Sequence, residues 1–246
     1  MRRPNVLATE TGAVRELAQL LADPIYLGAG VPRGDGRLVV VLPGLFANDL
    51  YLQPIRLWLR RLGYRPVRST LALNVGCPQR LCLQVEDALQ RELARRAGPV
   101  ALIGHSRGGI LARAIAARLH DKASHLIVLG SPVGAILRMP EWSAARAASE
   151  RLAPRLLTEA STRIRNLIDP DCDVPDCGCP FPDDLARPLS ARTAVVSLYS
   201  RDDPIVPARA CLIDGARNVE VGGTHSGLAH NRNVYRVLGQ ALADGR

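Results

Sequence analysis

The segment ALIGHSRGGILAR, residues 101–113, places one serine among glycines directly after an apolar run. Its central part GHSRG, residues 104–108, satisfies the pattern G-x-S-x-G, in which the serine stands at a sharp corner between a strand and a helix. Glycines beside this corner keep neighbouring backbones from colliding, and the serine hydroxyl is left exposed at the carboxyl edge of a sheet. The alternative is an ordinary tight turn, because the bare pattern also arises by chance. The flanking segments distinguish the two.

Short apolar runs alternate with amphipathic segments on both sides of the corner. The run LVVVL at 38–42 lacks polar alternation, which is typical of a strand buried on both faces. Strands that alternate with helices at this pace predict an α/β protein with a mostly parallel sheet covered by helices on both faces. We expect strands at 38–42, 64–70, 100–103, 125–129, 194–198 and 218–221, and helices at 13–22, 49–62, 83–97, 108–119 and 235–242.

One long interval, residues 131–191, interrupts the alternation. It shows no good strand, and it contains a polar helical pattern at 141–152 and the loop DPDCDVPDCGCPFPDD at 169–184. Insertions of this length after a sheet strand are usually lids, caps or functional loops rather than connections. The sequence therefore predicts one α/β domain spanning residues 1–246, with a lid at 131–191 inserted in it.

Partners for the serine follow two later strands. A serine hydroxyl attacks a carbonyl only with the help of a base, and the base needs a carboxylate that orients it. Asp202 and Asp203 follow the expected strand at 194–198, and His225 follows the one at 218–221. Because the carboxyl ends of parallel strands meet at one edge of a sheet, we expect these groups to converge on Ser106.

Two of these choices have competitors. Asp203 is preferred to Asp202 because it directly precedes the rigid segment PIVP at 204–207. His225 is preferred to His230, which falls where the closing helix is expected to begin, although a solvated loop histidine is the alternative for His225. His105 is expected to support the corner. His120 and His125 are expected at the surface or at a strand edge.

An oxyanion that forms on the attacked carbonyl needs hydrogen-bond donors. One should be the backbone N–H of Arg107, the residue after the serine. The other should come from the loop after the first strong strand, VVVLPGLFAND at 39–49. Gly44 lets the amides that follow it turn inward, so the N–H of Leu45 is expected to be the second donor, with Phe46 as the alternative.

With these residues in place, the chain resembles the α/β-hydrolase superfamily and, within it, compact bacterial lipases and esterases related to PGAP1-like hydrolases. The motifs LPGLFAND, GHSRGG, LGSP, YSRDDPIVP and GGTHSGLAHN stand in that family's usual order over roughly residues 37 to 242. The resemblance implies an α/β-hydrolase fold, a lid, and carboxylic-ester hydrolysis through an acyl-enzyme on Ser106, Asp203 and His225. We expect neither a cofactor nor a metal for this reaction.

Composition limits the partners. The net charge of +9 comes almost entirely from scattered arginines, since Lys122 is the only lysine, and no nucleic-acid recognition module is visible. We therefore expect a small-molecule or lipid ester as the partner and no nucleic acid, while peripheral contact with lipid surfaces and the oligomeric state stay open. No apolar stretch reaches the length of a secretory signal or of a membrane span, which makes a cytoplasmic protein the default expectation.

Six cysteines complicate that expectation of a cytoplasmic protein. Disulfides that tie Cys172, Cys177 or Cys179 to Cys211, for example, would favour an extracellular location, and free thiols are the alternative. A zinc site fits the cysteine spacing poorly. Asp169, Asp171 and Asp173 resemble the start of a calcium loop, but Val174 and Pro180 stand where such a loop needs glycine and glutamate.

Three functions share these features. The first is a serine ester hydrolase, an esterase or lipase acting on hydrophobic or lipid-like esters. The second is an acyltransferase that uses the same three side chains. The third is a hydrolase-like scaffold that binds a ligand without turnover, and a complete set of catalytic groups disfavours it.

Overall fold

The fold is seen in a computed structural model, which describes residues 11–139, 155–169, 172 and 178–244. Its centre is a six-stranded sheet in the order β2-β1-β3-β4-β5-β6, in which every neighbouring pair is parallel. The predicted α/β class and the parallel sheet are confirmed. The strands are β1 (Leu38–Leu42), β2 (Arg65–Val67), β3 (Val100–His105), β4 (Ala123–Leu129), β5 (Ala194–Tyr199) and β6 (Arg217–Glu220).

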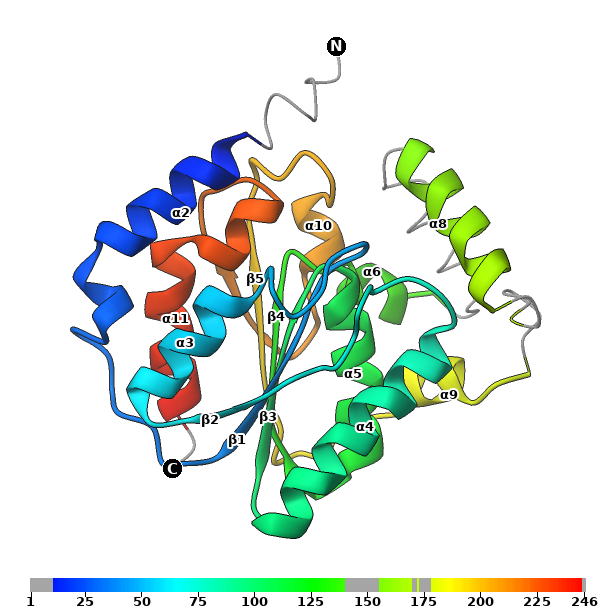
Figure 1. Ribbon diagram of the computed structural model, residues 1–246, viewed down its shortest axis with the longest axis horizontal. Coiled ribbons are helices and arrows are strands. Elements are labelled where there is room, and N and C mark those ends of the chain that lie inside the picture. The colour runs from blue at the N-terminus through cyan, green and yellow to red at the C-terminus, as the bar shows by residue number, and fades with distance from the viewer. Residues whose placement is uncertain (1–10, 140–154, 170–171, 173–177, 245–246) are drawn as a thin grey trace.

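Helices cover both faces of the sheet. Figure 1 shows α2, α3 and α11 on one side and α4, α5 and α9 on the other. The helical segments are α2 (Gly12–Ala22), η1 (Pro24–Leu27), α3 (Gln53–Leu62), α4 (Pro78–Arg95), α5 (Arg107–Leu119), η2 (His120–Lys122), α6 (Val133–Leu137), α8 (Arg155–Ile168), α9 (Phe181–Ala186), α10 (Ala208–Cys211), η3 (Ser226–His230) and α11 (Arg232–Ala243).

The core has two apolar layers, one on each face of the sheet. In β1, Leu38, Val40 and Leu42 pack into the layer under α4 and α5. Val39 and Val41 of the same strand pack into the layer under α3 and α11. A strand between two helical layers needs apolar side chains on both faces, which explains the unbroken LVVVL run.

The ends of two helices differ from the prediction because of local interactions. The helix expected at 49–62 begins only at Gln53, since the carboxylate of Asp49 instead accepts hydrogen bonds from the backbone N–H groups of Ser69 and Thr70, both at 3.1 Å. The helix expected from residue 83 begins earlier, at Pro78. Proline suits the first turn of a helix, where its missing N–H would have no partner in any case.

The interval at 131–191 contains helices α6, α8 and α9, and its described residues form no strand. The polar helix expected at 141–152 lies outside the described residues. The interval is joined to the domain at Asp169, whose carboxylate accepts from the Cys77 N–H at 2.7 Å and from Arg80 at 2.6 Å. At its other end, Asp184 of α9 forms an ion pair with Arg118 of α5 at 2.6 Å.

The corner between β3 and α5 is closely packed. Ser106 has φ 52° and ψ −124°, a backbone conformation that residues other than glycine rarely adopt. A Cβ on Gly104 would lie 2.4 Å from the Cα of Gly109, and one on Gly108 would lie 2.3 Å from the carbonyl oxygen of Leu42. Only glycine therefore allows the first turn of α5 to pass the ends of β1 and β3.

Gly104→Ala should lower the free energy of unfolding by about 1–3 kcal/mol, because the methyl group meets backbone atoms that cannot turn aside. Gly98→Ala is the matched control, since a Cβ on Gly98 meets nothing within 4 Å. Urea unfolding of both variants measures the difference. Equal stability of the two variants would show that the corner tolerates a side chain.

Candidate active site

Three side chains from distant segments form a hydrogen-bonded chain at the carboxyl edge of the sheet. The Oγ of Ser106, after β3, lies 2.9 Å from Nε2 of His225. Nδ1 of His225, after β6, lies 2.7 Å from Oδ2 of Asp203, which follows β5. Because three parallel strands end at one edge, residues that are 119 and 22 positions apart in the sequence meet there.

The carboxylate sets the direction of these hydrogen bonds. Oδ1 of Asp203 accepts from the N–H groups of Ile205 and Val206, each at 2.8 Å, and its side chain is 1% exposed. The other oxygen of this carboxylate, Oδ2, accepts from Nδ1–H of His225. Nε2 of the same ring keeps its lone pair toward Ser106, which is the position of a base that removes the hydroxyl proton.

The competing residues occupy other positions. Asp202 is exposed and makes no contact with the histidine, and its backbone N–H bonds to Ser200 Oγ at 3.0 Å. His230 ends η3 and precedes α11, so its expected place inside the closing helix is wrong. His125 is buried and bonds to Arg37 at 2.8 Å, which corrects the expectation of a surface residue. His120 is exposed at the surface, as expected.

The loop after β1 lies against the serine. A Cβ on Gly44 would be 3.3 Å from the Cβ of Ser106, so this backbone passes directly beside the serine. The N–H of Phe46 donates to the carbonyl of Asn74 at 3.3 Å and is therefore engaged in the loop itself. Among the described residues, no acceptor is found for the N–H of Leu45, which leaves that amide available to a ligand.

Comparisons with known proteins bear on the fold. A family model described as palmitoyl protein thioesterase matches residues 72–167. The chain is similar to the solved structure of a monoacylglycerol lipase from Paleococcus ferrophilus, with 16% identity, a TM-score of 0.54, and 88% of this chain and 97% of that chain covered. It is also similar to the structure of polyneuridine aldehyde esterase, with 14% identity, a TM-score of 0.51, and 85% of this chain and 100% of that chain covered. A comparison with curated proteins finds no match.

The chain has the α/β-hydrolase fold. The resemblance read from the five motifs is thereby confirmed at the level of the fold. A third hydrolase-fold relative, the thioesterase domain from the curacin biosynthetic pathway, has 15% identity and a TM-score of 0.50, with 86% of this chain and 92% of that chain covered. Among the described residues of this hydrolase-fold chain, no helix combines the length and the apolar character needed to cross a bilayer.

Asn74 holds the loop beside the serine, a role that no motif indicated. Its side-chain amide donates to the carbonyl of Pro43 at 2.6 Å, and its own N–H donates to the carbonyl of Ala47 at 2.9 Å. The guanidinium of Arg107 donates to the carbonyls of Asn74 and Gly76, at 3.0 and 2.8 Å. The side chain of Arg107 thus holds the loop at 74–76, while its backbone N–H stays at the start of α5.

Glu16 on α2 holds the histidine loop and was likewise missed. Its carboxylate accepts from the N–H of Thr224 at 2.8 Å and from the side-chain amide of Asn231 at 3.0 Å. A Cβ on Gly227 would lie 2.3 Å from Glu16 Oε1, so the loop can approach the carboxylate only because it carries glycine there. Nothing local in the helix at 12–22 indicates this contact, which spans more than 200 residues of sequence.

Two rings fix the backbone at His225. Nε2 of His105 donates to the carbonyl of His225 at 2.9 Å, and the hydroxyl of Tyr51 donates to the carbonyl of Ser226. Because the acceptor is a carbonyl, Nε2 of His105 must carry the proton. Burial lowers the pKa of His105 from 6.5 to about 3, so that ring is neutral at ordinary pH. His105 therefore positions His225 and does not exchange a proton with it.

The cysteines do not form the disulfide offered as an example. Cys211 is a buried free thiol, as are Cys77 and Cys82, so a bridge from the inserted segment to Cys211 is wrong. Burial raises the pKa of Cys211 to about 12, which keeps it in the unreactive thiol form. In the part of the chain that the structure describes, no three His, Cys, Asp or Glu side chains gather to hold a metal.

Some of the ligands that the zinc and calcium hypotheses require lie outside the described residues. The zinc hypothesis needs Cys177, and the calcium hypothesis needs Asp171 and Asp173, none of which the structure describes. Asp169, the remaining acidic residue of that run, is already engaged by the N–H of Cys77 and by Arg80. Asp169 therefore anchors the segment 131–191 to the residues before and within α4.

The free energy of unfolding should fall as the pH drops below 6.5. In the unfolded chain His105 takes up a proton near pH 6.5, whereas in the folded chain, where its pKa is about 3, it takes up a proton only near pH 3. Over this window the unfolded state binds the additional proton, and the slope reaches about 1.4 kcal/mol per pH unit. His105→Gln keeps a donor for the carbonyl of His225 but does not titrate, so its stability should depend less on pH between 6.5 and 4.

The matched control is His120→Gln, which alters an exposed histidine. Denaturant unfolding at several pH values measures each slope. If His105→Gln and His120→Gln lose stability equally steeply with acid, the buried ring at 105 is not the source of the dependence.

Proposed function

We propose that the protein is a serine carboxylic-ester hydrolase, an esterase or lipase that cleaves hydrophobic or lipid-like esters through an acyl-enzyme. The observation that carries the proposal is the continuous chain of hydrogen bonds from Asp203 through His225 to Ser106, at 2.7 and 2.9 Å. A structural role would not require a hydroxyl, an imidazole and a carboxylate in this order, with the hydroxyl on a strained corner.

Acylation begins when Oγ of Ser106 attacks the ester carbonyl carbon and its proton moves to Nε2 of His225. Asp203 accepts from Nδ1–H and stabilises the imidazolium that forms. When the tetrahedral intermediate collapses, the bond to the alcohol oxygen breaks, and the alcohol leaves with the proton from Nε2. The acyl group is then bound to Ser106 as an ester.

Deacylation repeats these steps with water. The imidazole of His225 takes one proton from the water as its oxygen attacks the acyl carbon, and the carboxylic acid leaves when Oγ of Ser106 regains a proton. In both halves the negative oxygen would be held by the N–H groups of Leu45 and Arg107. Removal of one such donor typically costs about 10²–10³ in rate.

Apolar side chains near the site support a hydrophobic substrate. Leu50 is 77% exposed and Leu73 is 37% exposed, and both lie within a few residues of the loops that Asn74 joins beside Ser106. We retain the segment 131–191 as a lid in this proposal, because the exposed Leu167 and Ile168 give α8 an apolar end that suits a lipid-like ester.

A thioester is the second candidate substrate, favoured by the palmitoyl protein thioesterase model that matches residues 72–167. The same three side chains attack an acyl carbon whether sulfur or oxygen leaves. An acyltransferase would also use them and would differ only in replacing water by an alcohol or amine acceptor. Matched p-nitrophenyl esters and thioesters of increasing chain length, assayed for the free acid released, separate these reactions.

Ser106→Ala should abolish labelling by a fluorophosphonate and lower kcat for p-nitrophenyl esters by roughly 10⁴–10⁶. The reason is that no other group can form the acyl bond. Gel fluorescence and initial rates measure the two effects. Labelling that persists in Ser106→Ala would refute the assignment of the nucleophile.

Asp203→Asn should lower kcat by about 10⁴, because an amide no longer holds the tautomer of His225 that accepts the serine proton. Asp202→Asn is the matched control: it alters the adjacent, exposed carboxylate and should leave kcat close to that of the unaltered protein. Steady-state kinetics of both variants measure the loss of kcat at each aspartate. Equal losses would point to the charge of the loop instead of the contact with the histidine.

A further inference from the structure

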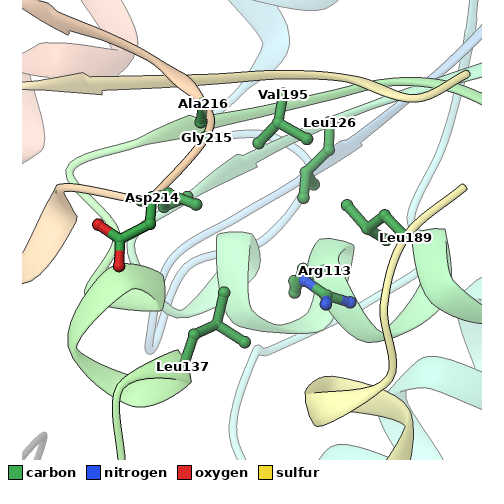
Figure 2. Close-up of a pocket in the computed structure, with 9 residues that line it drawn as sticks. Arg113, Leu126, Leu137, Leu189, Val195, Asp214, Gly215 and Ala216 are labelled. Atoms are coloured by element: carbon green, nitrogen blue, oxygen red, sulfur yellow. The ribbon is translucent and has the colours of Figure 1, made fainter. Parts of the chain in front are cut away.

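A cavity lies away from Ser106, on the face of the sheet that α5 covers. It has a volume of about 200 Å³ and lies between α5, the end of α6, the paired residues Leu126 of β4 and Val195 of β5, and the loop before β6. Most of its wall is apolar: Leu126, Leu137, Leu189, Val195 and Ile213. Figure 2 shows Leu126, Leu137, Leu189 and Val195 around the guanidinium of Arg113.

Arg113 is a buried cation that lacks a counter-charge. The residue is 5% exposed, and its Nη2 donates to the carbonyl of Arg187 at 2.6 Å. Its Nη1 is buried and has no hydrogen-bond partner, and no carboxylate in the described part of the chain forms an ion pair with it. Burial lowers the pKa of Arg113 to about 10, so the group still carries its charge at neutral pH.

An unpaired cation in an apolar environment is costly, and a water molecule would satisfy Nη1 without compensating the charge. Asp214 also lines the cavity, but it is exposed, and Figure 2 shows its carboxylate turned away from the guanidinium. The missing component is therefore an anion that enters the cavity. Apolar walls around the cation mean that the rest of the anion is apolar as well.

We propose that this cavity binds a small carboxylate with an apolar tail, paired through its carboxylate with Arg113. Nη1 is the donor without a partner, and an oxygen of a carboxylate would accept from it while the two charges pair. A cavity of about 150 Å³ can hold benzene, so one of this size suits an acid of roughly six carbons, such as hexanoate. The tail would contact Leu126, Leu137 and Val195.

This site is distinct from the proposed active site and does not rest on the proposed function. Arg113 lies seven residues after Ser106 on α5, which is about 10 Å along a helix axis. Its neighbour Leu126 lies in the middle of β4 and Val195 lies near the start of β5, whereas Asp203 and His225 follow the ends of β5 and β6. Binding at the two sites can therefore be told apart by position.

Titration of the full chain with sodium hexanoate and with hexanamide, by calorimetry at pH 7, tests the proposal. The two probes have similar shape, and only hexanoate is charged. We expect hexanoate to bind at least tenfold more tightly than hexanamide, and the backbone amide resonances of Gly215 and Ala216, which line the cavity, to shift on binding. Equal affinities, or shifts confined to residues around Ser106, would overturn the proposal.

Arg113→Met should remove the preference for hexanoate, whereas Arg15→Met, which alters an exposed arginine on α2, should retain it. Leu137→Trp is the second variant, because its larger side chain fills the cavity while Arg113 is unchanged; Leu21→Trp on exposed α2 surface is its control. We expect Leu137→Trp to weaken hexanoate binding at least tenfold. Unchanged binding in Leu137→Trp would overturn the proposal even if Arg113→Met fails to fold.

Discussion

The backbones of α5 and β1 pass each other so closely at Gly108 that no side chain fits between them. A Cβ there would lie 2.3 Å from the carbonyl oxygen of Leu42. This approach forces the corner at Ser106, puts the first turn of α5 beside the loop after β1, and leaves Gly44 against the serine. The hydroxyl and the amide of Leu45 thereby take fixed positions relative to each other, which a flexible loop could not maintain.

Buried polar contacts then hold the parts of the site that come from elsewhere. Glu16 fastens the loop that carries His225, and His105 bonds to the carbonyl of that same residue. Asn74 ties the loop after β1 to the segment before α4. Each of these groups binds at least one backbone atom of the loops around Ser106 and His225. Because burial keeps His105 neutral, this ring adds no charge beside His225.

Much of this arrangement follows from patterns in the sequence. The unbroken run LVVVL predicts a strand buried on both faces, and the run 104–108 predicts the corner, since each depends on residues that are neighbours in the chain. Asp203 could be preferred to Asp202 because proline follows it directly. The predicted start of α3 was wrong, since Asp49 bonds to Ser69 and Thr70, about twenty residues away, and the helix begins only at Gln53.

The sequence by itself determined the α/β class, the order of the elements and the three residue types that meet at the sheet edge. These properties depend on local periodicity and on strands that end in the same direction. Only the tertiary structure decided that Glu16 and Asn74 support the site, that His125 is buried, and that Arg113 lies in an apolar cavity without a counter-charge. These features depend on which side chains from distant parts of the sequence pack together, and the spacing of residues along the chain does not indicate such contacts.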